Sequence, residues 1–357
     1  MLKVLERLPY TGELPAGLAD ISAATYAGLP YAPADEPGLA QFCQLLSATH
    51  TIVFYTDHRT LRLAGLFPTE AGGPAYFGLW ETADDLALNR LAFAQLRAEA
   101  AARGFATVQG PLHGSTYFRY RLRLGEVPSW GQFDREPVNP PYYPRRLVEV
   151  GFTPRLSFES RRLRAATVPL VYQQQAAALS QLPDLPFEFI PLTAKTWQAL
   201  EDEIFVLIQQ VFGQNPAYRA VSRAQFALLY NATYAAGLCP YSSVLFRHRA
   251  SGQLAALSLC QPNYQPLHLP PGVAPTFAGH YSLLPTPRTL LAKTVGVHPA
   301  FRGQGLQALL AAYAMRSFLA YYDDVIFCLM RADNLSLRFT DGLPVETAHY
   351  ALFEQAV

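Results

Sequence analysis

The chain has 357 residues, of which half are hydrophobic and only 15% are charged. At roughly 100–200 residues per domain, this length predicts two domains, each with enough apolar residues to form a core. The formal net charge is only +1, which argues against electrostatic attraction to nucleic acid or to an anionic membrane. The sequence contains no run of about 20 apolar residues, so we expect no membrane span. Because Glu6 and Arg7 interrupt the start of the chain, we expect no signal peptide and a cytoplasmic location.

Residues that commonly bind metals or attack substrates are dispersed along the chain. The four cysteines form no CxxC pair, and the eight histidines form no HxH or HExxH sequence. We therefore predict no metal site and four buried free thiols. A GxSxG sequence is also absent, which argues against a serine hydrolase.

Residues 1–165 predict one domain. The hydrophobic patterns indicate three consecutive strands, a helix, a strand, a short helix and a last strand, at residues 51–55, 61–67, 75–81, 86–103, 105–109, 144–150 and 156–163. Three adjacent strands predict an antiparallel meander. Gly104 follows the long helix, where a glycine commonly ends one.

Residues 166–186 predict a linker, because a short polar helix is followed there by a proline break. The order of elements then returns in residues 187–357. We expect two helices, three strands, a helix and two final strands, at residues 196–212, 223–236, 243–249, 254–260, 289–297, 305–322, 325–330 and 347–354. The repeated order predicts an internal duplication and an α/β fold, with a mixed, mainly antiparallel sheet flanked by helices in each domain.

The stretch 294–309, TVGVHPAFRGQGLQAL, carries the strongest chemical signal. It predicts a strand, a glycine-containing loop and an amphipathic helix in immediate succession. Glycines let the backbone approach a ligand closely, and a helix start presents free N–H groups at the positive end of the helix dipole. This arrangement suits a phosphate or pyrophosphate. A tight turn without a ligand is the alternative for a bare GxG sequence.

The same stretch resembles motif A of the GNAT N-acetyltransferase superfamily, V-x-V-x-P followed by R-x-x-G-x-G/A. Five residues match in register: Val295, Val297, Pro299, Arg302 and Gly305. The resemblance implies an acetyl-CoA or other acyl-CoA co-substrate, whose pantetheine arm pairs with Val295 and Val297. It assigns the pyrophosphate to the loop residues Arg302, Gly303, Gln304, Gly305, Leu306 and Gln307. Gln307 departs from the motif, which usually has Gly or Ala at that position.

A second part of the family pattern follows the next strand, where an Asn precedes a Tyr by seven residues. Asn334 is present, and two interpretations stay open for it: a cofactor contact, or the N-cap of a short helix. Asp341 stands where the Tyr would protonate the leaving thiolate. Catalytic residues are therefore not assigned. Four side chains remain open as the base: Glu346, His298, Tyr281 and Tyr350.

The N-terminal half lacks the glycine loop, and Asp84 and Asp85 precede its long helix. Their charge would repel phosphates. Asn139, Tyr142 and Tyr143 nevertheless resemble the closing element of the same superfamily.

The resemblance as a whole implies a tandem bacterial GNAT-like protein with a degenerate N-terminal half, made of two acyl-CoA N-acyltransferase folds. Its C-terminal domain would transfer an acyl group to an amine acceptor by direct attack, with a strand amide near Val297 stabilising the oxyanion. Two alternatives are a non-catalytic acyl-CoA-binding or sensing protein, and transfer of an aminoacyl or fatty acyl group.

Overall fold

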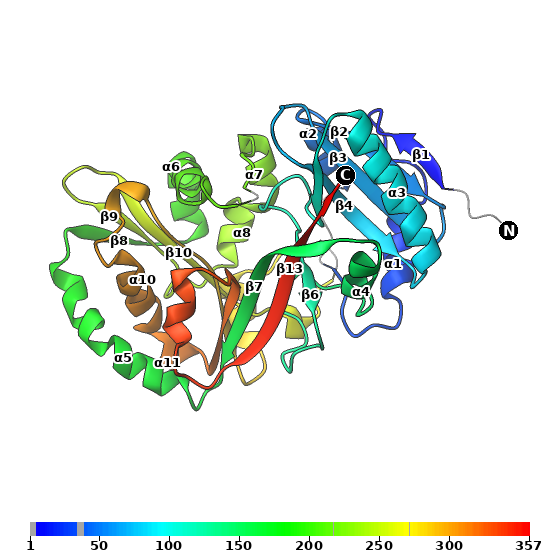
Figure 1. Ribbon diagram of the computed structural model, residues 1–357. Helices are drawn as coiled ribbons and strands as arrows, with labels where there is room; N and C mark the ends of the chain where they lie inside the picture. The colour runs from blue at the N-terminus through cyan, green and yellow to red at the C-terminus, as the bar shows by residue number, and fades with distance from the viewer. Residues whose placement is uncertain (1–4, 34–38, 217, 271) are drawn as a thin grey trace. The chain divides into compact units, whose positions relative to one another are not determined.

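The computed structural model describes residues 5–33, 39–216, 218–270 and 272–357. The chain forms two compact units (Figure 1). Unit 1 holds the residues up to Phe158 together with Ala348–Val357, and unit 2 holds Glu159–Thr347. Within the described residues, no helix combines the length and the apolar character needed to cross a bilayer.

The sheet of unit 1 begins with the predicted antiparallel meander. Its strands follow one another as β1 (Glu6–Pro9), β2 (His50–Thr56), β3 (Leu61–Pro68) and β4 (Ala75–Thr82). Next, β5 (Thr107–Gly110) pairs with β4 in parallel, and β13 (Glu346–Ala356) pairs antiparallel with β5 and with β6 (Leu122–Leu124).

Helices cover both faces of this sheet. The long helix α3 (Leu86–Ala102) and α4 (Tyr143–Glu149) pack on one face, where Phe93, Leu96 and Leu147 join the core (Figure 1). Arg62 alternates with the core residues of β3 and donates to the Leu18 carbonyl of α1 (Leu18–Tyr26), which places α1 on the other face. The remaining helix is α2 (Leu39–Leu46). Gly104 ends α3 in the left-handed conformation, with φ of 81°.

The sheet of unit 2 has one parallel pair among antiparallel neighbours. Its order is β12 (Asp324–Arg331), β11 (Thr289–Val297), β10 (Leu254–Pro262), β9 (Val244–His248) and β8 (Phe187–Pro191), and only β11 and β12 are parallel in this series. Beside β12 lies the end of β7 (Thr153–Leu163), where the Ser160 hydroxyl accepts from the Leu329 N–H.

Two layers of helices enclose the sheet of unit 2. On β11, Gly296 faces Val211 of α6 (Ala194–Phe212), while Val295 and Val297 pack towards α10 (Leu306–Met315). Since successive side chains of a strand point to opposite faces, α6 and α10 lie on opposite sides. Helix α5 (Val168–Gln181) packs beside α10. The other helices are α7 (Arg223–Leu229), α8 (Ala232–Ala236), α9 (Phe277–His280) and α11 (Phe318–Tyr321).

Several predicted elements are confirmed and others differ. The structure has β2, β3, β4, α3, β11 and β12 close to their expected bounds. The expected helix 223–236 is two helices, because the Asn231 side chain caps α8 and interrupts the chain there. The expected helix 305–322 likewise divides at Arg316 and Ser317. The patterns missed β1, β6 and β8, which have only three to five residues.

The unit boundaries also differ from the expected domains. Residues 166–186 form α5 and a 3-10 turn whose Leu179 and Leu182 pack into the core of unit 2, so this segment is part of a folded unit. Most of the last strand belongs to unit 1. Strand pairing with a distant segment of the chain leaves no local signal in the sequence.

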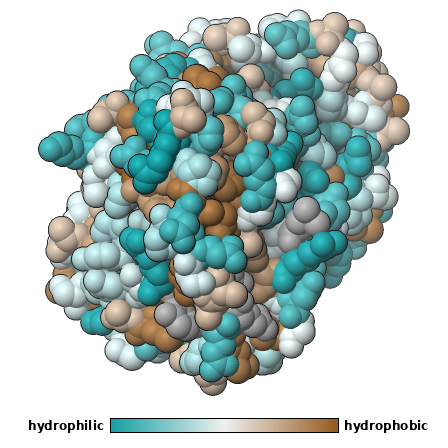
Figure 2. All heavy atoms as spheres, turned by 90° about the vertical axis from the view of Figure 1, so that its left-hand side faces the viewer, coloured by the Kyte–Doolittle hydropathy of each residue, from teal (hydrophilic) through white to brown (hydrophobic). Residues whose placement is uncertain are grey.

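One face of the molecule is drawn in Figure 2, where apolar residues form a band flanked by hydrophilic ones. More than half of the accessible surface of folded proteins is apolar. This band therefore assigns no site by itself.

Candidate functional site

The loop between β11 and α10 has the backbone geometry expected of a ligand cradle. Gly303 and Gly305 have φ values of 81° and 74°, a left-handed conformation that L side chains rarely adopt. A Cβ added at either glycine would meet nothing within 4 Å, so the space in front of the loop is open. The residues of the loop are exposed, whereas Leu306 is buried in the core and holds the helix start in place.

The N–H groups of residues 303–307 have no partner within the described part of the chain. Gly305 is the N-cap of α10 and provides no side chain to cap it. No hydrogen bond is made by the backbone N–H groups of residues 303–307, although the Gly305 carbonyl accepts from Ala308 and Leu309. Five consecutive amides thus remain for an external acceptor at the positive end of the helix dipole.

Strand β11 parts from β12 on the approach to this loop. The parallel pairing runs from Thr289 opposite Asp324 to Ala292 opposite Phe327 and then stops. Just beyond that point, the register of β11 with β10 shifts by one residue, which leaves Lys293 in a β-bulge. Bulges bend a strand and are frequent beside active sites. Residues 294–297 therefore have no neighbouring strand on this side within the described part of the sheet.

Val295 and Val297 direct their peptide groups to this open edge. The His298 N–H donates to the Ala255 carbonyl of β10. The register between the two strands places the peptide groups of Gly296 and Thr294 on the same side, facing β10. Because peptide groups alternate in direction along a strand, those of Val295 and Val297 point away from β10. Val295 and Val297, the two valines of the motif, therefore have N–H groups available to pair with a ligand.

The Arg302 side chain lies against the protein. Its Nη2 donates to the Val211 carbonyl at 3.2 Å and its Nε to the Val297 carbonyl at 3.4 Å. The first bond satisfies a carbonyl at the C-terminal end of α6, where the helix dipole favours a cation. Arg302 therefore connects the loop to the end of α6, a role that the sequence motif did not indicate.

Unit 1 has the same strand-turn-helix order with the opposite chemistry at the helix start. Asp85 is the N-cap of α3, and its side chain accepts from the Leu88 N–H at 3.0 Å. Asp84 forms ion pairs with Arg145 and Arg146. The positive end of α3 is thus occupied by a carboxylate of the chain itself.

The edge of β4 in unit 1 is also occupied. The Leu79 N–H donates to Nε2 of His113, the Thr82 N–H donates to the Tyr143 hydroxyl, and the Phe77 carbonyl accepts from the Leu112 N–H. Burial, followed by the negative charge of Glu81, holds the pKa of Tyr143 well above its usual value. The tyrosine of the closing element is therefore a neutral, buried partner of this edge.

Asn334 and Asp341 flank a short 3-10 helix, residues 335–340, that follows β12. The side-chain Oδ1 of Asn334 accepts from the Ser336 N–H at 3.2 Å, so Asn334 acts as an N-cap. The Asp341 side chain is 67% exposed and lies 3.9 Å from the Arg161 guanidinium.

The four side chains left open as a base are engaged elsewhere. Glu346 forms an ion pair with Arg164, and the Tyr281 hydroxyl donates to the Tyr321 carbonyl. Nδ1 of His298 accepts from the Ala300 N–H, and burial together with the Arg302 charge lowers the pKa of His298. Tyr350 is buried in unit 1. None of these contacts involves the open edge of β11.

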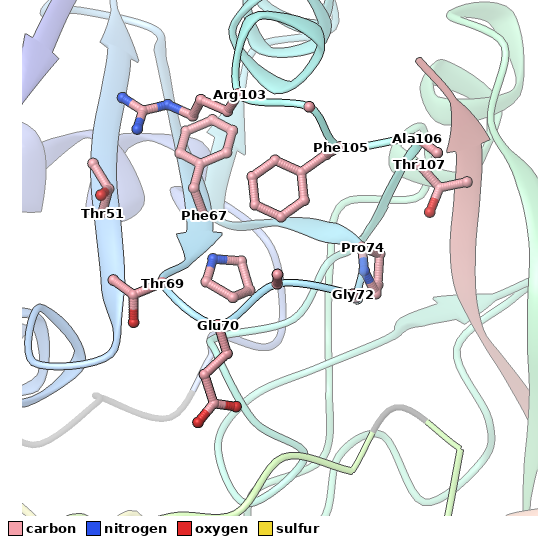
Figure 3. Close-up of a pocket in the computed structure, with 14 residues that line it drawn as sticks. Thr51, Phe67, Thr69, Glu70, Gly72, Pro74, Arg103, Phe105, Ala106 and Thr107 are labelled. Carbon is pink, nitrogen blue, oxygen red and sulfur yellow. The ribbon is translucent and has the colours of Figure 1, made fainter.

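A hollow of ≈ 830 Å³ lies elsewhere, in unit 1, between the β3–β4 turn and the start of β5 (Figure 3). The Phe67 and Phe105 rings lie 6.0 Å apart on its wall, and the Arg103 guanidinium sits 4.8 Å above the Phe67 ring. Its lining contains neither histidine nor cysteine. Apart from Glu70, its lining offers no group suited to acid-base chemistry.

The described residues contain no group of three His, Cys, Asp or Glu side chains placed to hold a metal ion. The four cysteines are free and buried, as expected. Burial raises the pKa of the Cys260 thiol to about 12, so this thiol is a poor nucleophile.

The chain is similar to solved structures over nearly its whole length. The tandem GNAT protein from the clavulanic acid biosynthesis pathway, solved without AcCoA, is 13% identical, and the match covers 99% of this chain and 98% of that chain with a TM-score of 0.51. A conserved protein of unknown function from Enterococcus faecalis V583, described as a probable N-acyltransferase, is 8% identical, with 99% and 73% covered and a TM-score of 0.52. No family model and no curated protein matches the chain.

At these identities the likeness concerns the fold. It agrees with the strand-loop-helix motif, the repeated order of elements and the mixed sheets described above. The protein has the tandem GNAT fold.

Proposed function

We propose that unit 2 binds an acyl-CoA, with acetyl-CoA as the first candidate, and transfers its acyl group to an amine. The pyrophosphate would accept hydrogen bonds from the N–H groups of residues 303–307, and the pantetheine amides would pair with the peptide groups of Val295 and Val297. Leu306 would contribute only its backbone, because its side chain is buried in the core. Asn334 lies beyond β12 and is proposed as a further contact.

The observation that carries the proposal is the contrast between the units. In unit 2 the N–H groups of residues 303–307 and those of Val295 and Val297 have no partners among the described residues, whereas unit 1 fills the equivalent positions with Asp85, His113 and Tyr143. An open strand edge and an uncapped helix start leave backbone groups without a partner in the protein, so they are available to a ligand. A ligand with two amides and a pyrophosphate would supply those bonds.

The chemistry proposed is direct transfer. A neutral amine attacks the thioester carbon, a C–N bond forms and the C–S bond breaks. Because the pantetheine amides would pair with Val295 and Val297, an N–H farther along β11, towards its bulge, would stabilise the developing oxyanion. The proton of the amine passes to solvent, so no covalent intermediate on the protein is needed.

The site is tested by Gly305→Glu, which places a carboxylate where the phosphates would bind. We expect binding of CoA to be lost in calorimetry, because the new side chain adds bulk and like charge. Gly125→Glu is the matched control: Gly125 also has a positive φ of 72° and open space around it, but lies in unit 1. This control should bind CoA as the unmodified protein does.

A second variant, Gln307→Glu, adds the same charge in the first turn of α10 without backbone strain. It should weaken CoA binding at least tenfold while the melting temperature stays near that of the unmodified protein. Normal CoA affinity in both folded variants would exclude this loop as the site.

Binding without transfer is a second candidate function. It is favoured by Asp341, which is exposed and stands where the family has a proton-donating tyrosine. The two functions are separated by measuring thiol release from acetyl-CoA with a panel of amines. Tight binding with no release above the hydrolysis background would favour a sensing role.

A further inference from the structure

Lys293 stands out as a charged residue at the point where β11 leaves β12. Only three of the 28 basic residues are lysines, Lys3, Lys195 and Lys293, and the other 25 are arginines. Lys195 is exposed in the first turn of α6, whereas Lys293 is half-buried in the bulge of β11. It follows the last residue of β11 that pairs with β12, Ala292.

The length of the proposed ligand brings its sulfur to this point. From Val297 back to Lys293 are four residues, or about 13 Å along the strand. A pantetheine arm contains two amide segments and a two-carbon thiol, which together are about as long as four extended residues. An arm that pairs with Val297 and Val295 therefore ends beside the bulge, within reach of a flexible lysine side chain.

We propose that the Lys293 ammonium stabilises the CoA thiolate as it leaves. This inference rests on the proposed function and adds a catalytic residue to it. When the amine nitrogen bonds to the thioester carbon, the electron pair of the broken C–S bond stays on sulfur. A cation beside that sulfur stabilises the thiolate without giving up a proton. The exposed Asp341 carboxylate cannot do this, because its charge has the wrong sign.

The test needs no acceptor. CoA labelled with carbon-13 next to sulfur is bound to the full-length protein, and the pKa of its thiol is followed by NMR. A free cysteine thiol has a pKa of about 8.5, and the thiol of free CoA, measured in the same buffer, is the reference for the bound one. A cation within a few ångströms should lower the pKa of the bound thiol by about 1 to 3. Lys293→Met should restore the pKa to near that of free CoA, while Lys293→Arg and the control Lys195→Met should keep it lowered.

The outcomes separate this inference from the proposed function. If the unmodified protein does not bind CoA, the proposed function fails. If it binds CoA but the thiol pKa is the same in the unmodified protein and Lys293→Met, only the role of Lys293 is excluded. If the protein binds CoA with a lowered thiol pKa and also shows turnover, Lys293→Met should lower kcat at least tenfold with little change in KM for acetyl-CoA. A loss confined to acyl donors that carry a free carboxylate would instead make Lys293 a specificity residue and overturn the proposal.

Discussion

Arg302 shows how one residue can match a sequence pattern and still take a role that the pattern does not describe. Its place before the glycines matches the motif, but its guanidinium donates to the carbonyls of Val211 and Val297. The sequence places Val211 91 residues away. At the residue scale, the backbone of the loop follows the motif, and the side chain follows the tertiary fold.

A second residue-scale feature is the carboxylate of Glu99 in unit 1, which accepts from two arginines. Arg7 donates to it at 2.8 and 2.9 Å, and Arg103 donates at 2.7 and 3.0 Å. The hydrogen bonds from Arg7, supported by those from Arg103, lower the pKa of Glu99 to about 2. The ionised form is thus favoured in the folded state.

This shift predicts a pH dependence of stability. A carboxyl with a lowered folded pKa stabilises the fold above its unfolded pKa of about 4.3, and this contribution is lost as the pH falls towards 2. The unfolding free energy of the protein should therefore exceed that of Glu99→Gln by a constant amount above pH 5, and the difference should shrink between pH 4.5 and 2. Since the arginine partners are partly exposed, the difference should stay below about 1 kcal/mol.

Urea unfolding across this pH range makes the measurement, with Glu70→Gln as the control because Glu70 is an exposed loop carboxyl. A difference that stays constant down to pH 2 would contradict the ion-pair assignment.

At the scale of elements, the two parallel strand pairs are built alike. Both β4 and β11 contain a bulge shortly after the pairing with their parallel neighbours ends, and Leu79 in the first has a positive φ of 48°. In each case the following helix starts beyond the opened strand. In unit 1, side chains of the chain itself bond to the backbone of the strand edge and of the helix start. In unit 2, the N–H groups of residues 303–307 have no such partner among the described residues.

The cap of α3 gives an element-scale prediction. Asp85→Ala removes the acceptor for the Leu88 N–H and should lower the unfolding free energy by about 0.5–2 kcal/mol in urea. Asp85→Ser retains a capping oxygen and should recover most of this loss. Asp84→Ala should cost less, because Asp84 takes part only in exposed ion pairs.

Equal losses for Asp84→Ala and Asp85→Ala would show that charge alone, and not the cap, matters at this helix start. Neither variant should gain CoA binding, because His113 and Tyr143 still occupy the β4 edge.

On the scale of the whole molecule, two strands carry the chain from one unit into the other. β7 begins in unit 1 and ends in unit 2, while β13 begins in unit 2 and ends in unit 1. The last residues of the chain thus complete the sheet of the first unit, where Phe353 lies opposite Gly110. A fragment ending at residue 165 would lack this strand, so CoA binding by unit 1 has to be tested in the full chain.

Tyr350 on β13 gives a prediction at this scale. Its hydroxyl donates to the buried Glu136 carboxylate at 2.5 Å. Burial raises the pKa of Glu136, and the hydrogen bond from Tyr350 opposes that rise. Tyr350→Phe leaves a buried acceptor short of a donor and should cost about 1–3 kcal/mol.

Hydrogen exchange should place the loss of protection in unit 1, around residues 107–139, although the substitution lies near the end of the sequence. Tyr10→Phe removes an exposed hydroxyl bond and should change little. Loss of protection confined to residues 159–347 would contradict the division into units.

The sequence by itself determined the elements whose causes are local. Alternating apolar residues predicted β2, β3 and β4, and helical periodicity predicted α3. Gly104, Gly303 and Gly305 have the positive φ values that glycine accommodates, so the end of α3 and the loop after β11 could be predicted from single residues. The candidate site residues from 295 to 307 could be named from the sequence because they are contiguous in the chain.

Only the tertiary structure decided the features that join distant segments. The parting of β11 from β12 after Ala292 and Phe327 depends on a strand pairing across 35 residues, and the bulge at Lys293 depends on the register with β10. Helix α8 begins where the Asn231 side chain caps it, and β13 pairs with β5 from the other end of the chain. Hydrogen-bond partners that are far apart in sequence impose no periodicity on the residues between them, and for that reason these features are absent from the sequence pattern.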